Sequence, residues 1–177
     1  SNTNLLYKNK WNGINIDLNP LSIELFNYMR PKDINLNIGI SSEETEKDLY
    51  FIDEFNTQNT LDKNQLNFLK NHHKIQENEI IKKKIKIKKI STILNDYKFT
   101  KINFFNIDIE GHELEVIKTI NFEKIKIQYL CLEMIDHNNL AIEYSNKIRD
   151  IIKKNDFDMI KKFGFNYIYK NKYFNYD

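Results

Sequence analysis

Three polar side chains that could do chemistry follow an apolar run in the middle of the chain. The run spans residues 102–107, I-N-F-F-N-I, and Asp108, Glu110 and His112 then alternate along the sequence. An almost continuous apolar run is typical of a strand buried on both faces of a parallel sheet. Because ligands bind beyond the carboxyl ends of strands in open α/β sheets, the pattern predicts a functional site. The alternative is an acidic turn that only caps the helix after it.

The residues around this segment predict a strand, a tight turn and a helix. Gly111 interrupts the extended pattern, and Leu114, Ile117 and Ile120 then recur at helical spacing. A second apolar run follows at 125–135, I-K-I-Q-Y-L-C-L-E-M-I, and predicts another buried strand. We expect the two strands to be adjacent and central in the sheet, because a helix lies between them and both are apolar on two sides.

Two more carboxylates lie near the predicted ends of strands. Glu133 stands near the end of the second apolar run, where a buried carboxylate needs a partner or a purpose. Asp17 ends a short strand predicted at 14–16, where a carboxylate can accept hydrogen bonds from both hydroxyls of a ribose. Its alternative role is to cap the helix predicted at 21–29. By the strand-end argument, we expect Asp17 and the Asp108 group to face one cleft.

The rest of the chain predicts a single α/β domain over residues 1–177, since it contains no repeat and no linker. Further strands are predicted at 34–40, 49–52 and 80–90, with a polar turn at 41–47. Further helices are predicted at 91–97 and 140–154. Strands at 157–163 and 165–169, on either side of Gly164, predict an antiparallel hairpin that closes the sheet.

Composition narrows the function classes. The chain has 177 residues, enough for one domain with a core, and a net charge of only +2. The basic segment 80–90 alternates Ile and Lys in its second half but lacks the aromatic residues of a nucleic-acid surface. No apolar run approaches the roughly 20 residues that span a bilayer. We therefore expect neither nucleic acid nor a membrane as partner. The single cysteine, Cys131, suits a buried thiol in a reducing compartment such as the cytoplasm.

Several motifs, in order along nearly the whole chain, resemble the FkbM-type family of S-adenosylmethionine-dependent methyltransferases. The segment I-D-I-E-G-H-E-L-E-V-I resembles the strand-four signature of that family, and L-C-L-E-M-I resembles its strand five. The segments W-N-G-I-N-I-D-L-N-P and N-I-G-I-S resemble strands two and three. The final F-D-M-I-K-K-F-G-F-N-Y-I-Y-K resembles the closing hairpin.

The resemblance implies a fold, a cofactor and a reaction. The fold would be a Rossmann-like class I methyltransferase sheet, mostly parallel, with a C-terminal antiparallel hairpin. The reaction would move a methyl group from S-adenosylmethionine to an oxygen of a small-molecule or carbohydrate acceptor, such as a sugar or natural product. Asp17 would hold the cofactor's ribose, while Asp108 and Glu110 would lie near its cationic end and the acceptor. His112 is the general-base candidate by residue type, with Glu133 a further catalytic candidate.

One departure from the family concerns the glycine-rich loop that follows its first strand. The chain has only four glycines, at 13, 39, 111 and 164, and no such loop. We therefore expect the first strand and its loop to be missing, and S-adenosylmethionine to bind weakly or not at all to this chain alone.

Two other functions use the same residues differently. Asp108, Glu110 and His112 could hold a hard metal ion in a metal-dependent hydrolase, because alternating residues of an extended segment share a face. The chain could instead be a non-catalytic, decayed methyltransferase domain that is retained for binding. The absence of the glycine-rich loop is the best support for this second alternative, while the hydrolase is the leading alternative.

Overall fold

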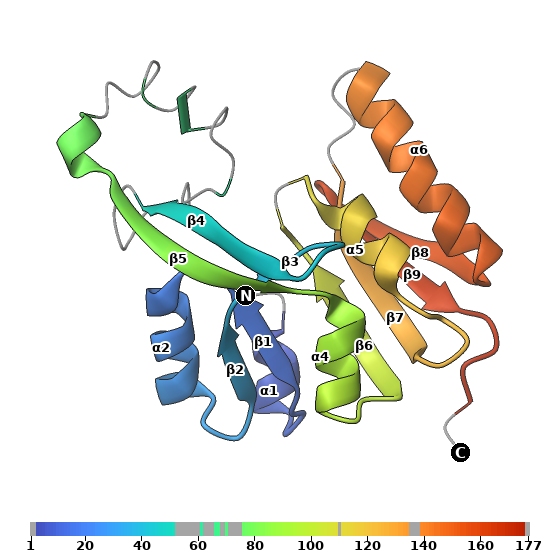
Figure 1. Ribbon diagram of the computed structural model, residues 1–177. Coiled ribbons are helices and arrows are strands. Elements are labelled where there is room, and N and C mark those ends of the chain that lie inside the picture. Colours follow the sequence, from blue (N-terminus) through green and yellow to red (C-terminus); the bar gives the residue numbers. More distant parts are fainter. Residues whose placement is uncertain are drawn as a thin grey trace. The chain divides into compact units, whose positions relative to one another are not determined.

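The chain is a mixed α/β protein (Figure 1). The computed structural model describes residues 3–51, 61, 66–67, 70, 76–109, 111–134 and 139–175. Two compact units divide it, Ser1–Lys88 and Lys89–Asp177, and each is described by itself. Within the described ranges, no helix is long and apolar enough to cross a bilayer.

Among its described residues, the first unit contains two small sheets. Its helices are α1 (Asn4–Lys8), α2 (Pro20–Met29) and a 3₁₀ turn at Glu77–Glu79. Its strands are β1 (Ile14–Asp17), β2 (Ile34–Asn37), β3 (Gly39–Ile40), β4 (Thr45–Phe51) and β5 (Ile81–Lys88). Strands β1 and β2 pair in parallel. In the other sheet β5 lies between β3, to which it is parallel, and β4, to which it is antiparallel.

The sheet β3-β5-β4 has an apolar face and a charged face, as the Ile–Lys alternation predicted. Ile85 and Ile87 of β5 are buried together with Leu49 of β4. On the other face, Asp48 of β4 forms ion pairs with two lysines of β5, Lys82 and Lys84, both at 2.8 Å. Strand β4 begins at Thr45, inside the segment that the sequence predicted as a turn, and the opposite charges across the strands favour its pairing with β5.

Gly39 is required by close packing at β3. A Cβ atom at this position would collide with Cδ1 of Ile87 and lie 3.0 Å from Cδ2 of Leu18. The absence of a side chain at Gly39 leaves room for the side chains of Ile87, its partner on the neighbouring strand β5, and Leu18.

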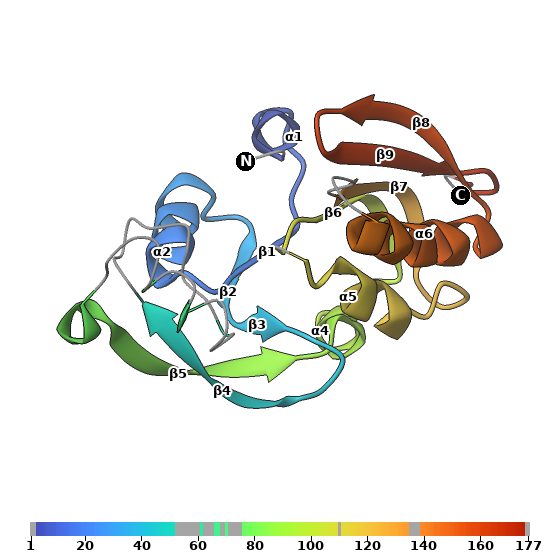
Figure 2. The same ribbon diagram turned by 90° about the horizontal axis from the view of Figure 1, so that it is seen from above.

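The described part of the second unit contains a four-stranded sheet with two helices on the same face. Its helices are α4 (Ile90–Asp96), α5 (Glu113–Thr119) and α6 (Asn139–Lys154), and α5 and α6 lie on the same face of the sheet (Figure 2). Its strands are β6 (Lys101–Ile107), β7 (Lys126–Glu133), β8 (Phe157–Phe163) and β9 (Asn166–Asn171), in the order β6-β7-β9-β8. Strands β6 and β7 are parallel, and the other two pairings are antiparallel.

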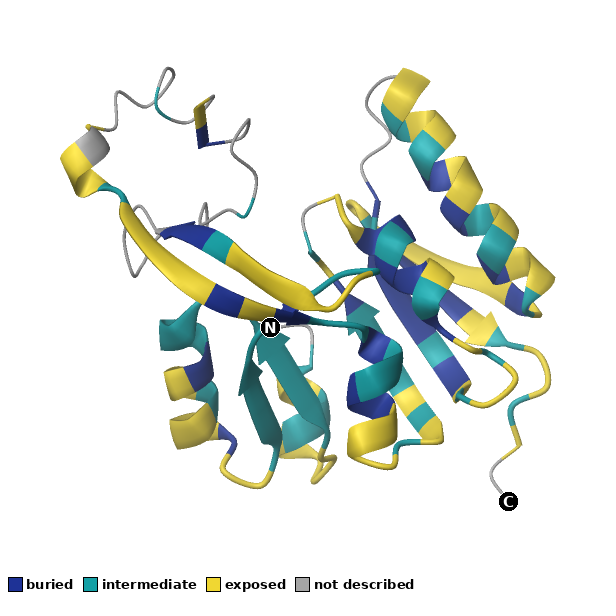
Figure 3. Ribbon diagram, in the orientation of Figure 1, coloured by how far each residue is buried: buried dark blue, intermediate teal, exposed yellow. Residues whose placement is uncertain are grey.

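The core of this unit lies between β7 and the two helices α5 and α6 (Figure 3). Leu130 and Leu132 of β7 have no exposed surface, and neither have Ile117 of α5 and Ile148 and Ile152 of α6. The four-residue spacing of Ile148 and Ile152 places both on one side of α6, so the helix covers the sheet with an apolar stripe.

The C-terminal hairpin is confirmed. Strands β8 and β9 turn at Gly164, whose φ of +55° lies in the left-handed region. The pairing shifts between Met159 and Lys161, so Ile160 forms a bulge in β8. Strand β8 is the last strand on its side of the sheet, and residues 158–163 are exposed.

Two expectations about the sheet need correction. The strands predicted at 102–107 and 125–135 are adjacent, but β6 is not central, because it ends the described sheet on the side away from β8. Only Ile107 of β6 is buried. The described strands also form sheets of mixed direction rather than a mostly parallel sheet. An apolar run indicates that a strand is covered, but it does not say on which edge another strand pairs with it.

Candidate functional site

The turn between β6 and α5 carries the residues that the sequence singled out. Asp108 directly follows the last residue of β6 and is exposed. Gly111 has a φ of +91°, which a glycine adopts without strain. His112 is exposed at the N-cap position of α5, and its side chain makes no capping hydrogen bond. Glu110 lies outside the described residues.

Glu113 holds this turn from within the helix. Its side chain is only 3% exposed, and Oε1 accepts hydrogen bonds from the amides of Ile109, at 3.2 Å, and Gly111, at 3.1 Å. A carboxylate in the first turn also interacts favourably with the helix dipole. Glu113 was not among the residues predicted from the sequence, although an acidic residue at the start of a helix that follows a glycine turn is a usable signal.

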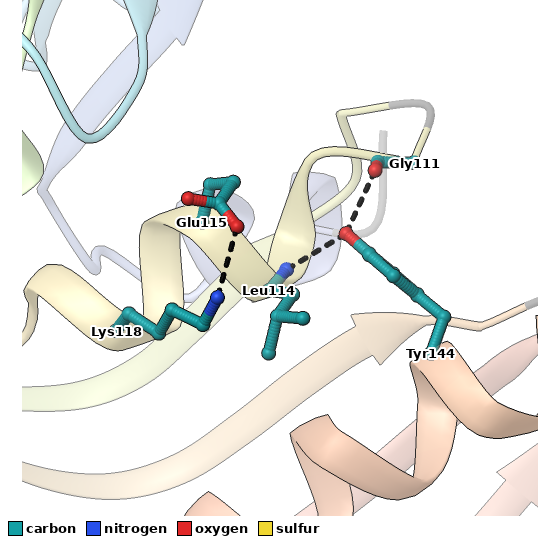
Figure 4. Close-up of polar contacts among 5 residues, drawn as sticks. All are labelled: Gly111, Leu114, Glu115, Lys118 and Tyr144. Atoms are coloured by element: carbon teal, nitrogen blue, oxygen red, sulfur yellow. Dashed lines mark hydrogen bonds and ion pairs between the residues drawn. The ribbon is translucent and has the colours of Figure 1, made fainter.

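Tyr144 of α6 holds the same turn from a second helix (Figure 4). Its hydroxyl donates to the carbonyl of Gly111 at 2.7 Å and accepts from the amide of Leu114 at 2.9 Å. Burial raises the pKa of Tyr144 to about 12, with a smaller opposing effect from the Leu114 amide and an added increase from the charge of Glu113. The phenol is therefore neutral at physiological pH and can donate and accept at once.

The neighbouring strand β7 brings two more groups to the same end of the sheet. Glu133 is its last residue, is partly buried, and pairs in register with Asn166 of β9. Cys131 is buried, and burial, followed by the negative charge of Asp108, raises the pKa of its thiol. Its surroundings are those of a structural thiol rather than a nucleophile, as its apolar segment predicted.

Asp17 ends β1 in the first unit, as predicted. Its Oδ1 accepts a hydrogen bond from the amide of Asn19 at 2.8 Å. No residue in the described part of the chain donates to its Oδ2. Asn37 of β2 donates through Nδ2 to the carbonyls of Asp17, at 3.0 Å, and Leu18, at 2.9 Å. The backbone at the end of β1 is thus fixed, while one carboxylate oxygen stays available.

Asparagine side chains that the sequence pattern did not single out connect the two strands β1 and β2, which lead to Asp17. Asn15 of β1 lies opposite Asn35 of β2 and donates through Nδ2 to its Oδ1 at 2.8 Å and to Oδ2 of Asp33 at 3.0 Å. Asp33 also accepts from the amide of Gly13 at 3.0 Å. In an Asn-rich chain this signal is hard to see, because only the register of the two strands shows which asparagines meet.

The second unit thus brings Asp108, His112 and Glu133 to the carboxyl ends of two adjacent parallel strands, and Asp17 lies in the first unit. A groove of about 640 Å³ opens near the opposite ends of these strands, beside Lys101 and Lys126, and none of the predicted site residues lines it.

The metal-dependent alternative finds no support in the described ranges. No three His, Cys, Asp or Glu side chains among those residues gather closely enough to hold a metal ion. Of the predicted set, Asp108 and His112 are described, and Glu110 is not among the described residues.

One comparison with known proteins identifies a family for this chain. The family model of the methyltransferase FkbM domain matches residues 1–159, a span that includes β1 with Asp17, the β6–α5 turn, and β7 with Glu133. No curated protein and no solved structure matches the chain significantly. Since the match extends over most of its 177 residues, the chain belongs to the methyltransferase FkbM domain family.

Proposed function

We propose that this chain uses S-adenosylmethionine to methylate a hydroxyl oxygen on a sugar or natural product. Family membership supports methyl transfer. The observation that supports the site is the turn after β6, where hydrogen bonds from Glu113 and Tyr144 to Gly111 hold the backbone and leave Asp108 and His112 exposed. Such a reaction depends mostly on the positioning of its groups and on a base that takes the hydroxyl proton.

The carboxylates present suit the cofactor. A ribose presents two neighbouring hydroxyl donors, and Asp17 has an oxygen to which no described residue donates. Asp108, exposed at the end of β6, offers a negative charge to a cationic group. When bound, S-adenosylmethionine supplies a methyl group made electrophilic by the attached sulfonium.

His112 is the residue we assign to proton transfer. Its imidazole is exposed and takes no part in capping α5, so it can accept the proton of an acceptor hydroxyl at a ring nitrogen. Asp108 and Glu133 are the carboxylates at the same strand ends that can take over this role. An acceptor with several hydroxyl groups, such as a sugar, matches this polar surrounding.

Binding of the cofactor product tests the proposal first. Saturation-transfer NMR with S-adenosylhomocysteine detects weak complexes, which suits a chain without a glycine-rich loop. We expect a signal that Asp17→Ala and Asp108→Asn reduce. Glu115→Gln is the matched control, since Glu115 lies on α5 and pairs with Lys118 at 3.1 Å (Figure 4).

Methyl transfer from labelled S-adenosylmethionine to a panel of monosaccharides and disaccharides is the second measurement. Transfer to at least one of them supports the proposal. Binding without transfer would favour the non-catalytic alternative. A result of neither binding nor transfer would overturn the proposed function for this chain alone and would agree with a need for the missing glycine-rich loop.

A further inference from the structure

We propose that Tyr144 is a positioning residue for methyl transfer, and this inference rests on the proposed function. Its hydroxyl caps α5 in place of the residue at the N-cap and so leaves the imidazole of His112 available for chemistry. The contacts of Gly111, His112 and Leu114 carry the argument.

The start of α5 is capped by a side chain from another helix and not by the side chain at its own N-cap. The first amides of a helix lack partners within it, and the side chain at the N-cap commonly accepts from the second or third of them. His112 occupies the N-cap but makes no such bond. The amide of Leu114, the second residue of α5, donates instead to the hydroxyl of Tyr144, 30 residues further along the chain. Tyr144, a residue of another helix, thus accepts the amide hydrogen bond that the side chain of His112 would otherwise accept.

The same hydroxyl also fixes the peptide that leads into His112. The carbonyl of Gly111 accepts from Tyr144 at 2.7 Å, and the amide of Gly111 donates to Glu113 at 3.1 Å. Glycine has more backbone freedom than any other residue, and a φ of +91° is only one of its accessible conformations. Holding both of its polar groups selects that conformation and with it the direction in which His112 leaves the turn.

The contact can be removed without removing the packing. The apolar stripe of α6 that covers the sheet is made by Ile148 and Ile152, which have no exposed surface. Tyr144→Phe keeps the ring and deletes only the oxygen that bridges Gly111 and Leu114. Tyr173→Phe is the matched control, because Tyr173 is 72% exposed and no described residue bonds its hydroxyl.

Amide hydrogen exchange measured on the purified chain tests the hydrogen bonds of the Tyr144 hydroxyl and does not require enzymatic activity. We expect the amide of Leu114 to exchange about tenfold faster in Tyr144→Phe and at an unchanged rate in Tyr173→Phe. An unchanged rate in Tyr144→Phe would show that the hydroxyl does not cap α5 and would overturn the proposal.

Kinetics then separate positioning from simple structural support. With the best sugar acceptor of the panel, we expect kcat of Tyr144→Phe to fall about 10–100-fold, while KM and the affinity for S-adenosylhomocysteine stay within about threefold. The profile of kcat against pH should keep its shape and have a lower maximum, since the base itself is still present. Faster exchange with an unchanged kcat would overturn the positioning role. If wild type shows neither binding nor transfer, the proposed function fails for this chain. The exchange data still report whether the Tyr144 hydroxyl caps α5.

Discussion

The carboxylate of Glu113 reaches back across the turn that precedes it and accepts the amide of Gly111 at 3.1 Å. The same oxygen accepts the amide of Ile109, so one buried side chain joins the end of β6 to the start of α5. This contact orders the segment between Asp108 and His112 from the inside, where solvent competes little for the two amides.

Replacing Glu113 should separate its acceptor role from its charge. Glu113→Gln keeps an oxygen for both amides, so we expect most of the stability to remain. Glu113→Leu leaves the amides of Ile109 and Gly111 without this acceptor, and the free energy of unfolding should fall by about 1–3 kcal/mol. Urea denaturation of the two variants checks this. Equal losses in both would show that the charge matters and the hydrogen bonds do not.

Gly111→Ala tests the backbone conformation of the same turn. An added Cβ meets no atom within 4 Å, so any cost is conformational and arises from the φ of +91°. We expect a loss of about 1–2 kcal/mol. Gly13→Ala is the control, because Gly13 also has open space around it and does not have a positive φ. Thermal unfolding compares the two, and equal melting temperatures would contradict the strain argument.

His112→Ala should lower turnover about 10²–10⁴-fold and leave cofactor affinity almost unchanged, if His112 takes the acceptor proton. Stability should change little, since the imidazole is exposed and makes no capping bond. Methyl transfer with the best sugar acceptor gives the rate. Near-normal turnover in His112→Ala, with loss of turnover in Asp108→Asn or Glu133→Gln, would move the base assignment to a carboxylate.

Asp17 should contribute mainly to cofactor binding. Asp17→Ala removes the acceptor for the ribose and should weaken binding of S-adenosylhomocysteine by about 1–3 kcal/mol. Asp17→Asn keeps an oxygen for the amide of Asn19 and so preserves the turn before α2. If Asp17→Asn binds as weakly as Asp17→Ala, the charge is what matters. Unchanged affinity in both variants, measured by NMR titration, would remove Asp17 from the site.

Tyr144 should make stability fall at alkaline pH. Its ordinary pKa of 10.0 is raised by burial to about 12 in the folded chain. Between these values the unfolded chain loses a proton that the folded chain keeps, so the contribution of Tyr144 is complete below pH 10 and is lost as the pH rises toward 12. Unfolding free energies of wild type and Tyr144→Phe should therefore converge over this range. Parallel curves would contradict the raised pKa.

The sequence predicted the elements of the second unit well because their apolar patterns are strong. The strand at 126–133, the helix at 139–154 and the hairpin at Gly164 all lie within a few residues of the prediction. The prediction of secondary structure failed where ion pairs or strand pairing determine the structure. Polar residues hid the start of β4, since Asp48 belongs in a strand only because Lys82 and Lys84 lie across from it.

The sequence predicted the residues of the candidate site from their types, but it did not predict the residues that hold the turn in place. Asp108, His112 and Glu133 lie at strand ends or in the turn after one, as the pattern indicated. Tyr144 could not be found, because a contact across 33 residues depends on how α6 packs beside α5. The roles of these residues, and the expectation that Asp17 serves the same cleft, stay predictions.

The bulge at Ile160 has a consequence for the behaviour of the chain at high concentration. An outermost strand offers unpaired backbone groups to any other strand, and Met159 and Phe163 are more than half exposed there. The shift in pairing makes the edge irregular, and Lys161 and Lys162 would place positive charge beside any strand that pairs with β8. A neighbouring copy therefore meets a poor template for cross-β stacking at this edge of the sheet.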